Sequence, residues 1–79
     1  MIFMAKLEAR GVPKIPRGVH EHKNTICRLL IECQIQAENH QGAKDRMLLA
    51  FILRSKPFKA FNEYDIIGNI SYEIRAMPN

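Results

Sequence analysis

The sequence predicts a small α+β domain in which a three-stranded, mainly antiparallel sheet carries one helix on one face, in the order β-β-α-β. Apolar and polar residues alternate along the segments 2–10, 27–38 and 64–77, and the segment between the last two has the composition of a helix. A period of two places successive side chains on opposite faces of a strand. We expect residues 1–79 to form a single domain, near the lower size limit for one hydrophobic core.

The alternation is most regular at 27–38, where odd positions hold apolar residues or cysteine and even positions hold polar ones, with Leu30 as the single exception. Segment 2–10 repeats the pattern, with Phe3 on its apolar face. Segment 64–77 does so again, and Gly68 falls on its apolar face. A glycine inside a strand indicates a bulge or a close backbone approach.

The segment 39–55 predicts a helix. The side chain of Asn39 is a favourable N-cap, because it can accept a hydrogen bond from an exposed amide of the first turn. The residues that follow are mostly strong helix formers. Pro57 disfavours helical geometry at the preceding residue, so the helix should end near residues 54 and 55. A buried strand is the competing interpretation of the apolar run 47–53, but the cap and the length favour a helix.

The connections favour the strand order second-first-third. A helix that returns along the second strand makes the third strand run in the direction of the second, so placing the third beside the first leaves every neighbouring pair antiparallel. The rival order first-second-third requires a parallel pair and a right-handed crossover. Residues 11–24 carry two prolines and three basic side chains, and we expect a long basic loop there. Loops of this length are often functional or disordered.

Composition predicts a cytoplasmic protein. A hydrophobic content of 47% with 25% charged residues is typical of a globular chain. No apolar run approaches the roughly 20 residues that a membrane span needs, and charges interrupt the apolar N-terminus before a signal-peptide core could form. Cys27 and Cys33 lie about 20 Å apart along one strand, too far for a disulfide, and two free thiols fit a reducing compartment.

No motif predicts an enzyme, a cofactor or a metal site. Neither serine lies in a Gly-x-Ser-x-Gly turn, and the chain has no glycine-rich phosphate loop and no evident pair of carboxylates. His20 and His22 with the two cysteines have the right chemistry for zinc, but their spacing does not match a compact site. We therefore expect no catalytic residue, no bound metal and no cofactor.

Two basic clusters indicate a charged partner. The net charge of +4 suits an acidic protein surface or nucleic acid. One cluster runs through 10–28, and the other interleaves basic residues with aromatics between residues 54 and 64. Such a pattern can hold a phosphate backbone and stack bases, but it also fits a solvated loop whose aromatics pack under the sheet. The candidate partner-binding residues are Lys14, Arg17, His20, His22, Lys23, Arg54, Lys56, Phe58 and Lys59.

The predicted helix carries more apolar side chains than one sheet face can cover. One stripe can face the sheet, and the strands, at about 40 Å, should extend past a helix of about 22 Å. Either the loops cover the surplus, with Ile15, Val19, Phe58 and Phe61 as lids, or another chain does. The second explanation is favoured because the loops are too polar to cover it all. The candidate self-association residues are Leu30, Leu49, Ile52 and Leu53.

These patterns predict a non-enzymatic binding module that acts through protein–protein contacts and forms a homodimer. A few strands and one capped helix in a chain of this size are similar to small phage and mobile-element proteins, including several anti-CRISPR proteins. The similarity is one of size and element order, and it implies a stoichiometric inhibitor or adaptor that occupies a site on a larger complex. The alternative is a basic nucleic-acid-binding protein that uses loop 10–28 and the segment from Arg54 to Tyr64.

Overall fold

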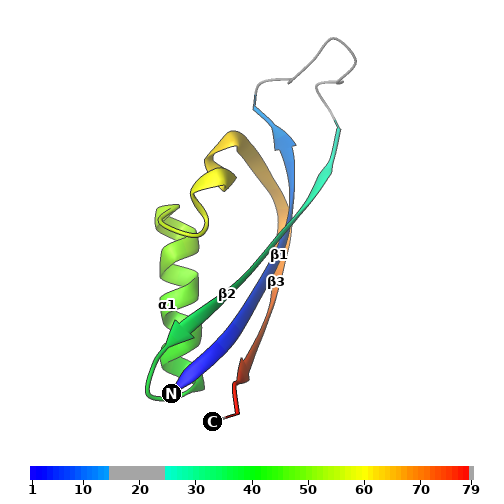
Figure 1. Cartoon of the computed structure of the whole chain (residues 1–79). Coiled ribbons are helices and arrows are strands. Elements are labelled where there is room, and N and C mark those ends of the chain that lie inside the picture. The colour runs from blue at the N-terminus through cyan, green and yellow to red at the C-terminus, as the bar shows by residue number, and fades with distance from the viewer. Residues whose placement is uncertain (15–24, 79) are drawn as a thin grey trace.

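The computed structural model, which describes residues 1–14 and 25–78, has the predicted α+β fold. Its three strands form one sheet in the order β2-β1-β3, and both neighbouring pairs are antiparallel. One helix covers one face of this sheet (Figure 1). The predicted strand order is therefore confirmed. The elements are β1 (Ile2–Pro13), β2 (Cys27–Gln36), α1 (His40–Leu53), the short 3-10 helix η1 (Lys59–Glu63) and β3 (Tyr64–Ala76).

The central strand β1 is longer than the sequence predicts, because residues 11–13 continue it. Gly11 is buried and pairs with Cys27 on one side and Ile66 on the other. A Cβ atom at this glycine would lie 2.9 Å from the Cβ of Tyr64, closer than such atoms approach. The prediction that the loop begins at residue 11 is wrong, since this glycine permits close packing inside the strand and does not end it.

Hydrogen bonds of β1 go alternately to its two neighbours. The N–H of Ala37 donates to the carbonyl of Met1 at 3.0 Å, and the N–H of Met77 donates to the carbonyl of Ile2 at 2.9 Å. Bonded pairs alternate along an antiparallel ladder, so odd residues of β1 bond to β2 and even residues bond to β3. The even residues of β2, which include Gln34 and Gln36, therefore direct their backbone N–H and C=O groups to the outer edge of the sheet.

The core lies between α1 and the odd-numbered side of β1. Leu7 and Met47 are among its largest fully buried side chains. Because β2 and β3 are edge strands, they add side chains that are only partly buried. The buried hydrophobic residues of β1 and α1 are Phe3, Ala5, Leu7, Ala9, Ala43 and Met47.

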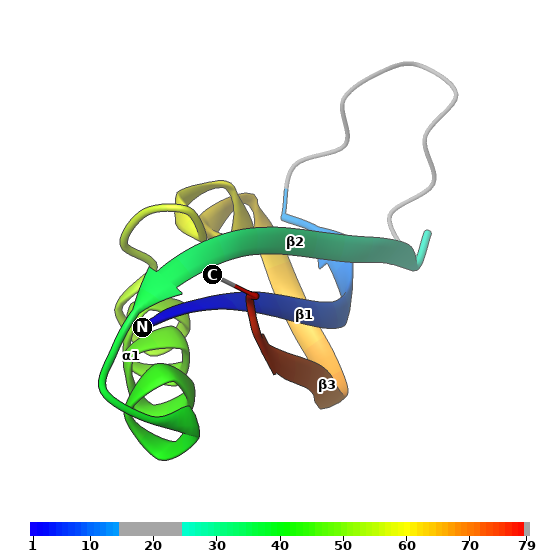
Figure 2. The ribbon, with the colours of Figure 1, turned by 60° about the horizontal axis from the view of Figure 1, so that its bottom comes forward.

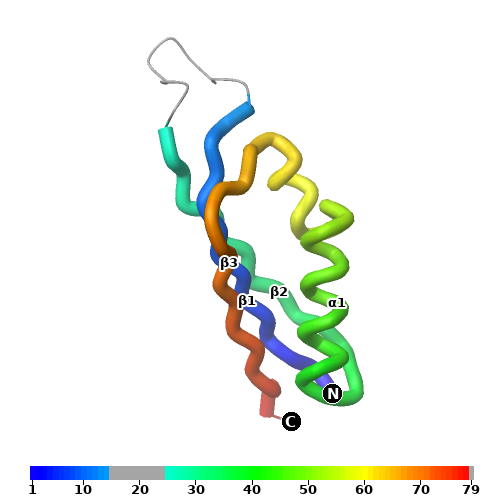
Figure 3. The backbone as a smooth tube through the Cα atoms, turned by 180° about the vertical axis from the view of Figure 1, so that it is seen from behind, coloured from blue at the N-terminus to red at the C-terminus, as the bar shows by residue number. Residues whose placement is uncertain are grey.

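The helix begins and ends as the sequence predicts. The side chain of Asn39 accepts a hydrogen bond from the N–H of Gly42 at 2.8 Å, and Arg54 ends the helix in a left-handed conformation with φ of 53°. The 14 residues of α1 span about 21 Å, whereas the 13 residues of β3 span about 43 Å. The sheet therefore extends beyond the helix, as the backbone trace in Figure 3 shows.

The connection between α1 and β3 closes one end of the core. Phe58 and Phe61 are 1% and 3% exposed. They pack edge-to-face on each other and on Phe51, with ring centroids 5.6 to 5.8 Å apart. Both rings are buried, but they leave Leu49, Ile52 and Leu53 exposed, so they do not cover the apolar surplus of the helix. The other two predicted lids, Ile15 and Val19, lie outside the described residues. The helix η1, which carries Phe61, is not predicted from the sequence.

A bulge interrupts the pairing of β3 with β1. The register shifts between Glu8 and Arg10 of β1, and opposite this shift Gly68 has a φ of 68°. Side chains disfavour this left-handed conformation, which glycine adopts readily. The predicted bulge at Gly68 is therefore confirmed.

Candidate partner-binding surface

The outer side of α1 exposes three large apolar side chains. Leu49, Ile52 and Leu53 are 57%, 68% and 66% exposed. Their spacing of three and four residues places them side by side on the last turns of the helix. We call these three residues the helix patch. The apolar surplus predicted from the sequence lies here, and no other described residue covers it.

A groove of about 440 Å³ separates the helix patch from the outer edge of β2. Figure 2 shows the end of β2 approaching α1, with the connection after the helix beside them. The strand contributes Cys33 and Ile35, the connection contributes Phe58, and the helix contributes Leu49 and Leu53. We call this cleft the edge groove. Its apolar lining continues directly into the helix patch.

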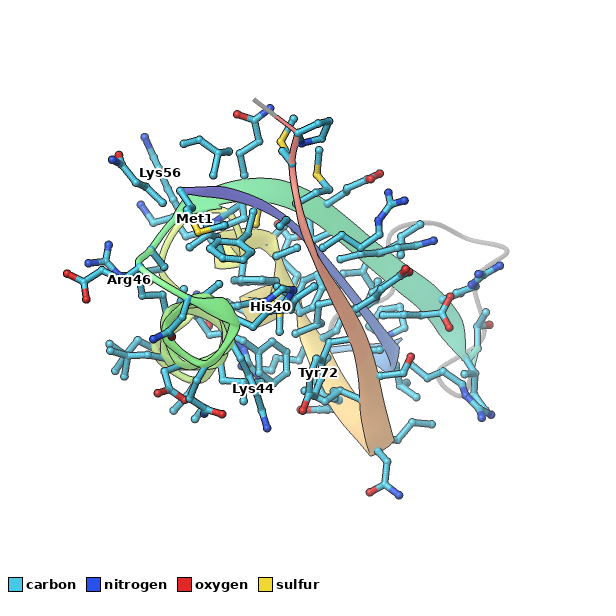
Figure 4. All side chains as sticks on the ribbon, turned by 90° about the horizontal axis from the view of Figure 1, so that it is seen from below. Met1, His40, Lys44, Arg46, Lys56 and Tyr72 are labelled. Carbon is cyan, nitrogen blue, oxygen red and sulfur yellow. The ribbon has the colours of Figure 1, made fainter. Side chains whose placement is uncertain are left out.

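Two cationic side chains stand at the rim of the edge groove. Arg46 and Lys56 line it, and Figure 4 shows both on the same side of the helix. Both are exposed, and within the described part of the chain neither forms an ion pair with an acidic side chain. The neighbouring Asp45 instead accepts a hydrogen bond from Gln41 at 2.9 Å. No acidic residue is among those that line the groove, so its rim is positively charged.

The thiol of Cys33 is an apolar contributor to the groove. Both Cys27 and Cys33 are free and partly buried, as the sequence predicts. Burial raises the pKa of the Cys33 thiol above its ordinary value of 9.0. The group is therefore protonated at neutral pH and acts as a small hydrophobic side chain.

The side of α1 away from the edge groove also carries a cation, Lys44, but this cation has an aromatic partner. The Nζ atom of Lys44 lies 5.5 Å from the centre of the Tyr72 ring, and Figure 4 shows the two side chains together. The proximity of Tyr72 is the main cause that raises the pKa of Lys44. This lysine has a neighbour within its own chain, unlike Arg46 and Lys56.

The structure spreads the predicted partner-binding residues over several places. Lys56 lies at the groove, and Lys14 and Lys59 are exposed at the ends of other elements. Arg54 is partly buried. Its guanidinium group donates a hydrogen bond to the carbonyl of Phe51 and lies 4.3 Å from the centre of that ring. The remaining predicted residues, Arg17, His20, His22 and Lys23, lie outside the described residues.

Phe58, a predicted contact residue, lies in the wall of the edge groove, where its ring is only 1% exposed. Its side chain is buried, and it packs against Phe51 and Phe61. The sequence placed it between two basic residues, a pattern that suits a stacking surface as well as a covered loop. Because Phe61 is buried and Tyr64 is partly buried, this segment holds no fully exposed aromatic ring for a nucleic-acid base.

Leu30 is exposed, but it lies on the other face of the sheet, opposite Glu8. The predicted self-association residues therefore form two separate surfaces. The outer sheet face around Leu30 balances its charges, since Lys6 lies between Glu32 and Glu73 on the two neighbouring strands. The charged residues of this face are Lys6, Arg10, Arg28, Arg75, Glu8, Glu32, Asp65 and Glu73.

Arg46 was not among the sequence candidates, although a signal for it exists. It precedes Leu49 by three residues and Leu53 by seven, so all three lie on one side of a helix. Cys33 and Ile35 were predicted to face the core, and their contribution to a groove depends on the position of α1 relative to β2. That position is not readable from periodicity.

Among the residues that the structure describes, no group of three or more His, Cys, Asp or Glu side chains could hold a metal ion. Two members of the zinc set considered above, His20 and His22, lie outside these residues. No helix in the described part of the chain is long and apolar enough to cross a membrane.

Comparison with known proteins identifies no relative. No protein-family model matches the chain. No curated protein and no solved structure shows a significant match. The chemistry of the helix patch and the edge groove is therefore the basis for a function.

Proposed function

We propose that this chain is a non-enzymatic binding module that contacts a protein partner through the helix patch and the edge groove. The observation that carries the proposal is the exposure, by 57% to 68%, of three neighbouring apolar side chains beside an apolar groove. Contiguous apolar surface of this kind marks contacts with other chains. Complete burial of such a side chain stabilises by about 1.5–3 kcal/mol. Because each of the three is already partly buried, a partner that covers it gains only the corresponding fraction of this free energy on binding.

The mode of action that fits this surface is occupancy of a site on a larger complex, as an inhibitor or adaptor in a fixed stoichiometry. This is the role that the similarity to small phage and mobile-element proteins implies. The positively charged rim formed by Arg46 and Lys56 favours an acidic surface on the partner. A small fold with an apolar contact region suits this role, which requires no catalytic group.

A homodimer would use the same helix patch. Two copies related by a two-fold axis would place Leu49 and Leu53 of one against those of the other. Self-association would then compete with partner binding. Leu30, on the other sheet face, would require a second and separate contact. Light scattering coupled to gel filtration separates these cases, because it gives the mass of the wild-type chain across a range of concentrations.

Affinity purification of the tagged chain from its source cells tests the proposal. We expect one protein to co-purify in a fixed ratio with the wild type. Leu53→Lys should abolish this, because it places a charge in the apolar contact. Leu30→Lys is the matched control: it makes the same change at an exposed leucine on the other face, and it should leave the ratio unchanged.

Two results would contradict the proposal. The first is equal recovery of the partner with Leu53→Lys and with the wild type, when both variants have the circular dichroism spectrum of the folded chain. The second is loss of the co-purifying material after nuclease treatment, together with retardation of DNA or RNA that weakens steeply with salt. The second result would favour the nucleic-acid alternative.

A further inference from the structure

The outer edge of β2 combines three features at one place. Its backbone groups at Gln34 and Gln36 point away from β1, as the alternation of hydrogen bonds requires. Both residues line the edge groove, together with the side chains of Cys33 and Ile35 from the same strand. An unpaired strand edge therefore borders an apolar groove.

We propose that the edge groove binds an extended acidic segment of a partner protein, which adds a fourth strand to the sheet beside β2. This inference rests on the proposed function and names the form and chemistry of the partner. Added strands gain affinity from main-chain hydrogen bonds and specificity from alternate side chains. Here the backbone groups of Gln34 and Gln36 supply the hydrogen bonds, and every second side chain of the segment enters the apolar groove.

The acidic character of the segment follows from the rim. Arg46 and Lys56 are exposed and unpaired within the described residues, and no acidic residue lines the groove. An aspartate or glutamate on the incoming segment would neutralise them. A second copy of this chain is the poorer occupant, because each copy has a net charge of +4 and like charges oppose association.

A defined probe comes from selection of random peptides, about nine residues long so that they span a typical strand, displayed on phage against the folded full chain. We expect the selected peptides to alternate apolar residues with others and to contain at least one acidic residue. Nuclear magnetic resonance of the labelled chain should then show the largest amide shifts at Gln34 and Gln36. Selection of no peptide, or of basic peptides, would overturn the proposal.

Charge reversal tests the rim. The double variant Arg46→Glu with Lys56→Glu should bind a selected peptide about tenfold or more weakly, because both attractions become repulsions. Lys44→Glu, which reverses one charge on the opposite side of α1, is the matched control for the single variant Arg46→Glu, and its affinity should stay near the wild-type value. Equal losses in Lys44→Glu and Arg46→Glu would show a general effect of net charge and would overturn the assignment of this rim.

Backbone methylation tests strand addition. A selected peptide methylated on the alternate nitrogens that face β2 should lose binding, whereas methylation of the other nitrogens should have little effect. Gln34→Pro provides the same test from the protein side, because it removes an outward N–H that β1 does not use. Gln34→Ala, which keeps this N–H, is its control.

Binding that is insensitive to every methylated position would overturn the strand-addition mode. A wild-type dimer whose mass falls to that of a monomer in Gln34→Pro would assign the edge to a second copy and overturn the proposal. Neither outcome contradicts the proposed function, which depends on the effect of Leu53→Lys on a co-purifying protein. Conversely, if Leu53→Lys leaves the co-purifying protein unchanged while the selected peptide still binds the groove, the proposed function is contradicted and strand addition is not.

Discussion

The two outer edges of the sheet differ in regularity. On one side β2 pairs with β1 without interruption from Cys27 to Gln36. On the other side β3 is the longer strand, but a bulge at Gly68 breaks its register. Bulges are one of the means by which proteins keep edge strands from pairing with other chains. The β3 edge carries such protection, whereas the β2 edge has neither a bulge nor a proline along Cys27–Gln36.

The cations beside the two edges also differ, because the one beside β3 has a partner in its own chain and those beside β2 have none among the described residues. Beside β3, Lys44 lies against Tyr72 of its own chain. Beside β2, Arg46 and Lys56 have no acidic partner in the described residues. Both β2 and β3 are edge strands, so exposure of an edge alone does not set the proposed contact surface apart. The β2 edge differs from the β3 edge because it combines a regular row of free backbone N–H and C=O groups, an apolar groove and cations without an acidic partner in the described residues.

The largest effect on stability should come from the wall of the edge groove. Phe58→Ala removes a buried ring that packs against Phe51 and Phe61, and should lower the free energy of unfolding by about 3–5 kcal/mol. Tyr72→Ala, at a 43% exposed ring on the β3 side, should cost about 1 kcal/mol or less. Urea denaturation followed by circular dichroism measures both values.

The conservative variant Phe58→Leu controls for the size of the cavity. It should recover much of the stability that Phe58→Ala loses, because it keeps most of the apolar volume. Similar losses in Phe58→Ala and Tyr72→Ala would show that the two sides of α1 are packed alike, contrary to the comparison above.

The bulge at Gly68 should give the next largest effect. Gly68→Ala introduces a side chain at a φ of 68°, which should cost about 1–2 kcal/mol. The cost comes from the backbone, since no atom lies within 4 Å of the added Cβ. Gly68→Asn is the control, because asparagine tolerates this conformation better. Equal thermal stability of Gly68→Ala and the wild type would contradict the assigned bulge.

Loss of the cap at Asn39, between the end of β2 and the start of α1, should have a slightly smaller effect on the free energy of unfolding. Asn39→Ala removes the acceptor for the N–H of Gly42 and should lower the free energy of unfolding by about 1 kcal/mol. Asn39→Ser restores a capping oxygen and should restore most of the loss. Thermal denaturation of the three proteins checks this, and identical midpoints would contradict the cap.

The smallest effect concerns the two cysteines of β2. Labelling of Cys33 by a thiol reagent should be slow at neutral pH and should increase as pH rises beyond 9.0, because burial raises the pKa of this thiol and the thiolate is the reactive form. The same raised pKa makes a small stabilising contribution that is present below 9.0 and is lost as pH rises through the raised value.

Cys33 also reports on the groove. A bound acidic peptide should slow the labelling of Cys33 and leave that of Cys27 unchanged, because only Cys33 lines the groove. Mass spectrometry after limited labelling distinguishes the two positions. Equal protection of both cysteines would place the peptide elsewhere.

Much of the fold is readable from the sequence because local rules act on single segments. The period-two pattern predicts all three strands, the capping side chain of Asn39 predicts the start of α1, and the break in the pattern at Gly68 predicts the bulge. The strand order follows from the direction in which the helix returns the chain. The end of β1 could not be predicted, because Gly11 is required by its distance to Tyr64, a residue remote in sequence.

The candidate site is less readable. Exposure of Leu49, Ile52 and Leu53 follows from counting apolar residues around a helix, and the structure places them outward as expected. The burial of Phe58 and the groove beside β2 depend on how the connection after α1 folds back. Such an arrangement is set by packing between distant segments and leaves no periodic signal in the sequence.

The alternation of side chains along β2 has a consequence for insertions and deletions. A shift of β2 by one residue would exchange Cys33 and Ile35 for Gln34 and Gln36 on the helix-covered face. The β2 side of the edge groove would then be polar, although the helix and the connection after it would still supply apolar side chains. Length changes inside β2 therefore remove the contribution of this strand to the groove, whereas a residue added at 37–39 would leave the strand register as it is.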